Sequence, residues 1–276
     1  TNIVVDSKID NSFFFCNFYN GGGVAIGDIN NDSLCDVLLT SNQGENKLYL
    51  NKGGFKFEDI TAKSGMQQES MWSTGAVMAD VNNDGWLDMY VCNSGHMKSG
   101  HRKNKLYINN KGRGEALFTE SATQYGLDIV AYTTQVSFFD HDLDGDLDCF
   151  MINNSPMPIN NPGYENKRDL PEAQWPVADS LKGGGDHLYR NDNNKFIEVT
   201  KKAGIHGTLI SFGLGVSVGD INEDGYPDLY VANDSYERDY LYINQRNGTF
   251  KDEMETCMEQ NSFSSMGADI ADINND

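Results

Sequence analysis

The stretch Asp80-Val81-Asn82-Asn83-Asp84-Gly85-Trp86-Leu87-Asp88 decides how this chain is organised, because its pattern recurs along the sequence. Each copy, called an acidic loop below, has Asp at positions 1, 5 and 9, Asn or Asp at position 3, and usually Gly at position 6. The residues at positions 1, 3, 5 and 9 are Asp28, Asn30, Asp32 and Asp36 in loop one, Asp80, Asn82, Asp84 and Asp88 in loop two, Asp140, Asp142, Asp144 and Asp148 in loop three, and Asp220, Asn222, Asp224 and Asp228 in loop four. A fifth copy, Asp272, Asn274 and Asp276, breaks off at the last residue.

Oxygen-bearing side chains at alternate positions of a tight loop converge on one point, and Ca²⁺ takes about six to eight oxygen ligands. The pattern resembles an EF-hand loop at positions 1, 3, 5 and 6, but it closes with Asp at position 9 instead of Glu at position 12. Backbone carbonyls at position 7 would come from Leu34, Trp86, Asp146 and Tyr226. One copy would fit an acidic surface turn equally well, since Asp, Asn and Gly favour turns. Four copies in register predict four complete Ca²⁺ sites, with the fifth truncated and empty.

Two of the loops depart from the common pattern. Ser33 stands where the other loops carry Gly85, Gly145 and Gly225. A non-glycine residue must then adopt a left-handed backbone conformation, which costs about 1 kcal/mol. We therefore expect loop one to bind calcium most weakly. Loop three has Asp142 instead of Asn at position 3, so we expect it to bind most tightly.

The formal net charge of the chain is -20, from 21 basic and 41 acidic residues. This acidity makes nucleic acid and anionic membrane surfaces poor partners. The sequence has no apolar run of about 18 residues, so we expect no membrane insertion. The five cysteines form no Cys-x-x-Cys pair and are odd in number, which argues against a disulfide framework. The first residues lack the pattern of a signal peptide, as a processed or excised fragment also would.

The first aspartates of successive loops are 52, 60, 80 and 52 residues apart, a period typical of propellers and solenoids. Each repeat reads as a Gly- and Ala-rich strand, the acidic loop, an apolar strand, a Leu-Tyr strand, a polar turn and a Phe-led strand. In the second repeat these strands begin near residues 75, 89, 105 and 118. Gly and Ala in the first strand indicate close backbone approach, as around the axis of a propeller. The pattern predicts an all-β fold, a β-propeller of four-stranded antiparallel blades.

The repeats predict one incomplete propeller over residues 1–276. Its blades would cover roughly residues 17–66, 67–127, 128–205 with an insertion at 153–185, and 206–260, followed by a truncated blade at 261–276. About four and a half blades cannot close a ring of seven. We therefore expect the chain to be a fragment of a longer protein with further C-terminal blades and a C-terminal domain.

The chain resembles FG-GAP/VCBS repeat proteins, with the integrin-type calcium propeller as a more distant relative. The segment Phe212-Gly213-Leu214-Gly215-Val216, next to Gly219-Asp220, is nearest to the motif that names the family. The patterns Asn-x-Leu-Tyr-x-Asn, Phe-x-Asp/Glu-x-Thr and Ala-Asp-Val-Asn-Asn-Asp-Gly resemble more narrowly bacterial surface proteins that carry a C-terminal ASPIC/UnbV domain, relatives of cartilage acidic protein. The resemblance runs from about Asn17 to Asp276. It implies the propeller fold and the calcium, and says little about the ligand.

In antiparallel blades the loop between strands two and three lies at the end opposite the acidic loop. This second face would receive the insertion at 153–185, which holds five of the six prolines. A long loop of this kind is either an ordered ligand platform or a plain structural cover. Tyr, Trp and Arg often anchor interfaces, and aromatic rings also stack on sugars. The candidate ligand residues on this face are Trp72, Tyr132, Tyr164, Arg168, Trp175, Tyr236, Glu237 and Arg238.

Three other signals favour plain structural interpretations. Ser217 lies in a Gly-x-Ser-x-Gly pattern, but the run belongs to a first strand that leads into an acidic loop and not into a helix, so it is not a nucleophile elbow. His96 and His101 lack further ligands at metal spacing and are interpreted as solvated loop residues. His141 is at position 2 of its loop and is expected to point away from the ion.

Our first hypothesis is therefore a non-enzymatic, calcium-stabilised propeller that binds a glycan or a protein through the face opposite the acidic loops. We expect it to be extracytoplasmic, at the cell surface, in the periplasm or secreted. The alternative is a carbohydrate-active enzyme, a lyase or glycosidase, on a calcium propeller. A purely structural assembly module is the third possibility. The fold alone does not choose among them, because propellers carry unrelated functions.

Overall fold

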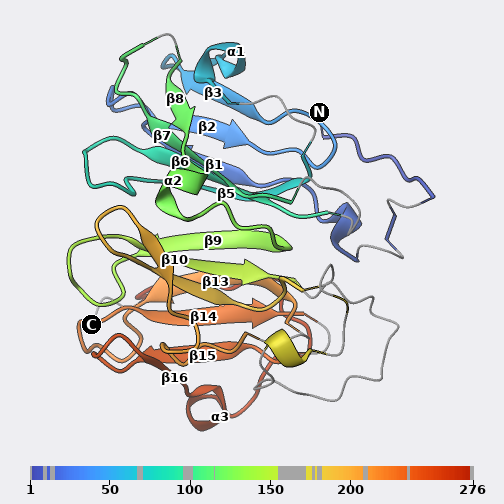
Figure 1. Cartoon of the computed structure of the whole chain (residues 1–276), viewed down its shortest axis with the longest axis vertical. Helices are drawn as coiled ribbons and strands as arrows, with labels where there is room; N and C mark the ends of the chain where they lie inside the picture. Colours follow the sequence, from blue (N-terminus) through green and yellow to red (C-terminus); the bar gives the residue numbers. More distant parts are fainter. Residues whose placement is uncertain are drawn as a thin grey trace. The chain divides into compact units, whose positions relative to one another are not determined.

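The computed structural model of the protein describes residues 2–8, 11–12, 16–66, 71–95, 102–114, 116–154, 172–175, 178, 182–207, 211–234 and 237–273. The chain divides into two compact units. Unit 1 comprises Thr1–Thr133 and Asn193–Lys195, and unit 2 comprises Thr134–Asp192 and Phe196–Asp276. Each unit is built on two four-stranded antiparallel sheets, and Figure 1 labels most of their strands.

In all four sheets the strands are hydrogen-bonded in sequence order, as a simple meander. The first sheet has β1 (Val24–Gly27), β2 (Asp36–Leu39), β3 (Lys47–Asn51) and β4 (Phe57–Asp59), and the second has β5 (Ser73–Ala79), β6 (Asp88–Asn93), β7 (Lys105–Asn109) and β8 (Phe118–Glu120). The third has β9 (Thr133–Phe139), β10 (Asp148–Asn153), β11 (His187–Asn191) and β12 (Phe196–Glu198), and the fourth has β13 (Gly213–Gly219), β14 (Asp228–Asn233), β15 (Tyr240–Asn244) and β16 (Phe250–Asp252). The predicted four-stranded antiparallel sheets are confirmed.

Helical structure among the described residues is limited to single turns. These are η1 (Cys16–Tyr19), α1 (Thr61–Ser64), α2 (Ala122–Tyr125), η2 (Glu172–Gln174) and α3 (Met254–Cys257). The helices α1 and α2 follow the outer strands β4 and β8, and each ends at a glycine with a left-handed backbone, Gly65 and Gly126. None of the helices in the described part of the chain has the length and apolar character needed to cross a membrane.

Glycines let the first strands of consecutive sheets approach closely. In unit 1 the Gly23 N–H donates to the carbonyl of Thr74 at 2.8 Å, and a Cβ at position 23 would lie 2.6 Å from that oxygen. In unit 2 a Cβ at Gly215 would lie 3.0 Å from the Cα of Gly267. A larger residue at Gly23 or Gly215 would push the neighbouring segments apart, which explains why glycine occupies these two positions.

Apolar side chains from the second and third strands fill the space between the two sheets of each unit. In unit 1 the buried cluster includes Leu38, Leu48, Met89, Val91 and Tyr107. In unit 2 it includes Phe150, Leu188, Leu229, Val231 and Tyr242. Because both faces of these strands are covered, the second strands β6 and β10 are buried along their whole length.

An asparagine at the end of the third strand ties each unit together. In unit 1 the Asn109 Nδ2 donates to the carbonyl of Leu87 in its own sheet (3.0 Å) and to the carbonyl of Ile29 in the preceding acidic loop (2.8 Å). In unit 2 the Asn244 Nδ2 donates to the carbonyls of Pro227 and His141 in the same way. The asparagine therefore links one sheet to the acidic loop of the sheet before it.

We expect Asn109→Ala to lower the free energy of unfolding by about 2 kcal/mol, since two carbonyls lose their donor. Asn51→Ala is a matched control, because Asn51 ends β3 at the equivalent place but its Nδ2 bonds, within the described part of the chain, to Cys35 of its own repeat alone. This control should cost about 1 kcal/mol. Urea denaturation measures both variants, and equal losses would contradict a linking role for Asn109.

Candidate metal sites

Each acidic loop joins the first and second strands of one sheet. Position 1 directly follows the first strand, and position 9 is the first residue of the second strand, as Asp36, Asp88, Asp148 and Asp228 open β2, β6, β10 and β14. The four loops consequently occupy the same place in all four sheets. The structure brings three predicted carboxylate ligands within 4.8 Å of one another in loop three, whereas the aspartates of loops one, two and four form no such group among the described residues.

The position-1 carboxylate holds the loop in shape by accepting two backbone N–H groups. In loop two, Asp80 accepts from Asp84 at 2.9 Å and from Gly85 at 2.7 Å. Asp28, Asp140 and Asp220 make the same two bonds in the other loops. At position 5, one oxygen accepts the N–H of position 7, as between Asp84 and Trp86 at 3.0 Å, and this bond also recurs in all four loops. These bonds turn the carboxylates toward the inside of the loop.

The position-9 carboxylate is buried and joins three parts of each sheet. In loop two, Asp88 accepts the N–H of Val81 at position 2 (3.2 Å) and the N–H of Asn109 at the end of the third strand (2.8 Å). The other three loops repeat this pair of bonds, with Asn51, Asn191 and Asn244 in the place of Asn109. Sequence analysis missed this partnership, although the last Asn of the Asn-x-Leu-Tyr-x-Asn pattern was its signal.

Burial raises the pKa of three of the position-9 aspartates, Asp36, Asp88 and Asp228, and so makes them harder to ionise without a nearby cation. Burial raises the pKa of Asp88 to about 7, and the charges of Asp84 and Asp80 act in the same direction, while the N–H groups of Asn109 and Val81 oppose the shift. Burial likewise raises the pKa of Asp36 and of Asp228. A bound cation would favour the charged form of all three.

The backbone of each loop is left-handed at two positions. At position 6 the φ angles are 69° for Ser33, 85° for Gly85, 97° for Gly145 and 87° for Gly225, so the expected left-handed conformation of Ser33 is confirmed. Sequence analysis missed the second left-handed position, position 4. Its residues are Asn31, Asn83, Leu143 and Glu223, with φ between 55° and 59°. Only the two asparagines are residues that tolerate this conformation well.

The donor set fits a hard cation. Carboxylate oxygens of Asp140, Asp142 and Asp144 all lie within 4.8 Å of one another. At position 3, the Oδ1 atoms of Asn82 and Asp142 are buried without a hydrogen-bond partner. Buried oxygens of this kind are satisfied when they coordinate an ion, and an all-oxygen set suits Ca²⁺ or Mg²⁺ better than zinc or copper. Of the fifth loop, Asp272 is described, whereas Asn274 and Asp276 lie outside the described residues.

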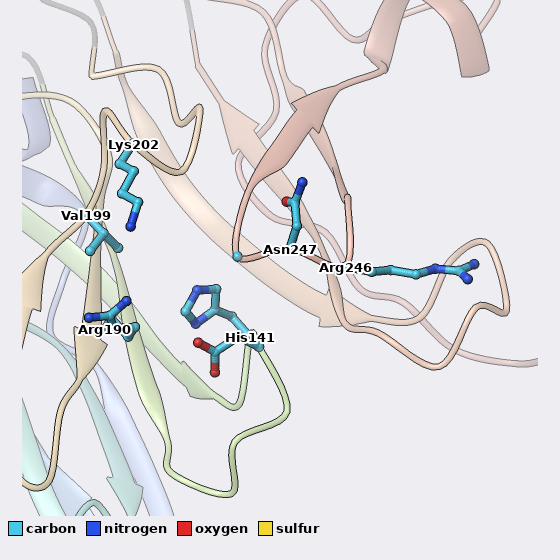
Figure 2. A pocket seen from close by; sticks show the side chains of 8 residues that line it. His141, Arg190, Val199, Lys202, Arg246 and Asn247 are labelled. Carbon is cyan, nitrogen blue, oxygen red and sulfur yellow. The ribbon is translucent and has the colours of Figure 1, made fainter.

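His141 does not simply point away from loop three. Its ring is buried, and its Nδ1 is hydrogen-bonded to Asp148 of the same loop. Although burial opposes the shift, this hydrogen bond and the charge of Asp148 raise the pKa of His141. A pocket of about 170 Å³ lies beside the His141 ring. Figure 2 shows Arg190 and Lys202 to the left of the ring and the Arg246 side chain on the right, extending away from it.

Most of the described candidates for the ligand face are covered. Trp72 and Tyr132 are buried, Trp72 against Phe18 with ring centroids 5.1 Å apart and Tyr132 under the Arg102 guanidinium. Trp175 and Glu237 are also buried. Arg238 is partly exposed and pairs with Asp252 at 2.7 Å. The remaining candidates, Tyr164, Arg168 and Tyr236, lie outside the described residues.

The structural interpretation of Ser217 is supported. It lies within β13, and its Oγ donates to the carbonyl of Ala268 at 2.6 Å. A strand continuing into an acidic loop is not the strand-turn-helix of a nucleophile elbow. His96 and His101 lie outside the described residues. Cys92 and Cys149 are buried, as a small apolar residue would be.

We expect Ser33→Gly to tighten calcium binding at loop one, because glycine adopts φ 69° without strain of about 1 kcal/mol. The reverse change in loop two, Gly85→Ser, is the matched control. An added Cβ at Gly85 would meet nothing within 4 Å, so this variant tests the backbone alone and should weaken loop two. Calorimetric titration measures both, and no gain for Ser33→Gly would contradict the expectation.

We also expect calcium uptake to release protons. Because the pKa of Asp88 is raised from 3.8 to about 7, this group stabilises the cation-free fold fully below pH 3.8 and loses that contribution as the pH rises through about 7. Titrations at about pH 6.5 in two buffers of different ionisation enthalpy should therefore give different heats. Asp88→Asn should remove most of the difference, and equal heats for the unmodified protein would contradict the prediction.

Comparison with known proteins places these loops in a family. The FG-GAP-like repeat matches residues 17–91, 177–231 and 220–276, which is more than half of the chain. Cartilage acidic protein 1 of Xenopus tropicalis is 31% identical over 128 residues, covering 46% of this chain and 19% of that protein. Integrin alpha-6 of Gallus gallus is 43% identical over 70 residues, covering 24% of this chain and 6% of that protein. The chain thus spans less than a fifth of the length of these relatives.

Among solved structures, the GH43_1 enzyme from Xanthomonas citri complexed with xylotriose aligns over 84% of this chain and 72% of its own. The sequence identity is 9% and the TM-score is 0.36, an overlap too loose to support any inference. The family match and the four meander sheets agree with the fold class and the family that the repeats predicted. The chain belongs to the FG-GAP-like repeat family, and its sheets are the four-stranded blades of an all-β propeller fold.

Proposed function

We propose that the protein is a calcium-stabilised binding module that acts outside the cytoplasm. Four acidic loops would each hold one Ca²⁺, and the blades they stabilise would present the opposite face to a glycan or a protein partner. The observation that carries the proposal is one hydrogen-bond pattern, repeated in four loops of different sequence, that turns acidic oxygens inward.

In each loop the oxygens at positions 1, 3, 5 and 9 and the carbonyl of position 7 would hold the ion. The position-1 and position-9 side chains each use both oxygens to accept N–H groups, which fixes their orientation before an ion binds. When bound, Ca²⁺ would supply positive charge next to the buried position-9 carboxylates. The position-3 oxygens of Asn82 and Asp142, which have no hydrogen-bond partner, would gain one contact each.

Two further considerations support a binding module outside the cytoplasm. The relatives reported above are an integrin and cartilage acidic protein 1, which are names of surface and extracellular proteins. A chain with the same family of repeats would work in the same setting. Calcium is also abundant outside the cytoplasm, where weak extracellular calcium modules work. The proposed partner face follows from the topology of the blades. In each antiparallel sheet, the loop between strands two and three lies at the end opposite the acidic loop.

A thermal melt in Ca²⁺, in Mg²⁺ and in EDTA tests the proposal. Each site saturated at about 100 times its dissociation constant adds roughly 2.7 kcal/mol of stability, so we expect a large rise in the melting temperature with Ca²⁺. Mg²⁺ should give a smaller rise, since it demands a tighter octahedral site. A melt that is indifferent to EDTA would contradict the proposal.

The same assay, at fixed Ca²⁺, tests the partner. A panel of glycans should contain one that raises the melting temperature further, and pull-down with the chain in Ca²⁺ against EDTA covers a protein partner. Chemical conversion of a glycan during the assay would favour the carbohydrate-active enzyme. No shift by any glycan and no calcium-dependent protein partner would favour the assembly module.

A further inference from the structure

Two of the four acidic loops are touched by a basic side chain of their own blade. In loop two, the Lys111 Nζ lies 3.0 Å from the Oδ2 of Asp84 at position 5. In loop four, the Arg246 Nε lies 3.0 Å from the Oδ2 of Asp224, again at position 5. In loops one and three, the described residues place no basic side chain on the position-5 carboxylate. The loops therefore fall into two classes.

The difference arises at one turn position, which lies two residues after the asparagine that ends the third strand. The position is held by Gly53, Lys111, Asn193 and Arg246 in the four repeats. Its φ is 77°, 56°, 55° and 58° in the same order, so the backbone is the same whether or not the side chain is charged. Only repeats two and four place a long basic side chain there, where Gly or Asn fits the backbone better.

The turn is fixed relative to the acidic loop by the same asparagine that bonds to position 9. The Lys111 N–H donates to the Asn109 Oδ1 at 2.9 Å, and the Arg246 N–H donates to the Asn244 Oδ1 at 2.9 Å. In repeat one, the Gly53 N–H makes the equivalent bond to Asn51. A Cβ at Gly53 would lie 3.9 Å from the Leu34 side chain at position 7 of loop one. A side chain at this turn position consequently starts next to the loop.

The basic groups sit on the oxygen that an ion would need. One oxygen of Asp84 already accepts the N–H of Trp86, so its Oδ2 is the oxygen left for a ligand, and Lys111 takes it. Asp224 likewise accepts the N–H of Tyr226 with Oδ1, and its Oδ2 accepts from Arg246 and from the Asn222 Nδ2 at position 3. The Lys111 and Asp84 side chains are 32% and 20% exposed, so their ion pair is less screened than an ordinary surface pair, whereas the Arg246 side chain is 57% exposed and its pair with Asp224 is screened more.

We propose that Lys111 and Arg246 are internal counter-ions of loops two and four, which a calcium ion must displace from the position-5 carboxylate when it binds. The inference rests on the proposed calcium binding and adds to it. Loops two and four then keep part of their charge balanced when calcium is scarce, and each binds the ion more weakly than it would without its basic side chain. Among the described residues, loop one has no such substitute, and the basic partner in loop three is His141 on the position-9 carboxylate instead of a side chain on position 5. Each unit thus combines one loop of each class.

Loop two offers a local readout, because Trp86 occupies its position 7. Energy transfer from a tryptophan to bound Tb³⁺ falls steeply with distance, so tryptophan-excited Tb³⁺ luminescence reports mainly on this loop. Competition by Ca²⁺ then gives the calcium affinity of loop two in the full chain. We use Lys111→Asn as the test variant, because Asn193 shows that asparagine adopts this turn.

Lys111→Asn should tighten Ca²⁺ at loop two by about tenfold, since a positive charge next to a divalent ion is removed. Arg113→Asn is the matched control, because it removes the same charge two residues further on, from an exposed side chain whose described contacts do not include the loop. This control should change the affinity less than about twofold. Lys111→Arg, which keeps the charge, should stay close to the unmodified protein.

A second measurement separates competition from a mere change in folding. In EDTA, Lys111→Asn and the corresponding Arg246→Asn should melt at a lower temperature than the unmodified protein, while the gain on adding Ca²⁺ should become larger. An unchanged affinity for Lys111→Asn, or an equal change for Arg113→Asn, would overturn the inference and leave calcium binding intact. An unmodified protein that binds neither Tb³⁺ nor Ca²⁺ would overturn the proposed function as well.

Discussion

The structure depends on one buried aspartate in each blade, the first residue of that blade's second strand. Asp36, Asp88, Asp148 and Asp228 have almost no exposure to solvent, and each accepts one N–H from its acidic loop and one from the asparagine that ends the third strand. A buried carboxylate is costly unless its charge is balanced and its oxygens are bonded. The backbone meets the second condition in all four blades, and a cation in the loop would meet the first.

The asparagine partner carries this local arrangement into the fold. Asn109 and Asn244 bond to the position-9 aspartate with the main chain and to the acidic loop of the preceding blade with the side chain. Within each unit, the acidic loop of one sheet is therefore held against the end of the third strand of the next sheet. A cation that stiffens the loops would stiffen the contact between blades as well, which gives the many acidic residues of the chain a role in stability.

The sequence was sufficient for features that repeat and insufficient for those that depend on packing between segments. Four copies of the loop predicted the strands on either side, and the Ser33 substitution predicted its left-handed backbone. The burial of Trp72, Tyr132 and Trp175 was not visible, because aromatic residues look the same in sequence whether they face a partner or the interior. Lys111 and Arg246 were overlooked for a related reason. Each lies more than twenty residues from the carboxylate it meets, and only the strand register brings the turn to the loop.

The central claim is that each acidic loop holds one ion to balance its buried aspartate, and counting ions on the intact chain tests it most directly. Native mass spectrometry of the protein after exchange from calcium into a volatile buffer should show four bound Ca²⁺, and Asp84→Ala, which changes loop two alone, should show three. A chain that carries no bound calcium, or a count that Asp84→Ala leaves unchanged, would contradict the account.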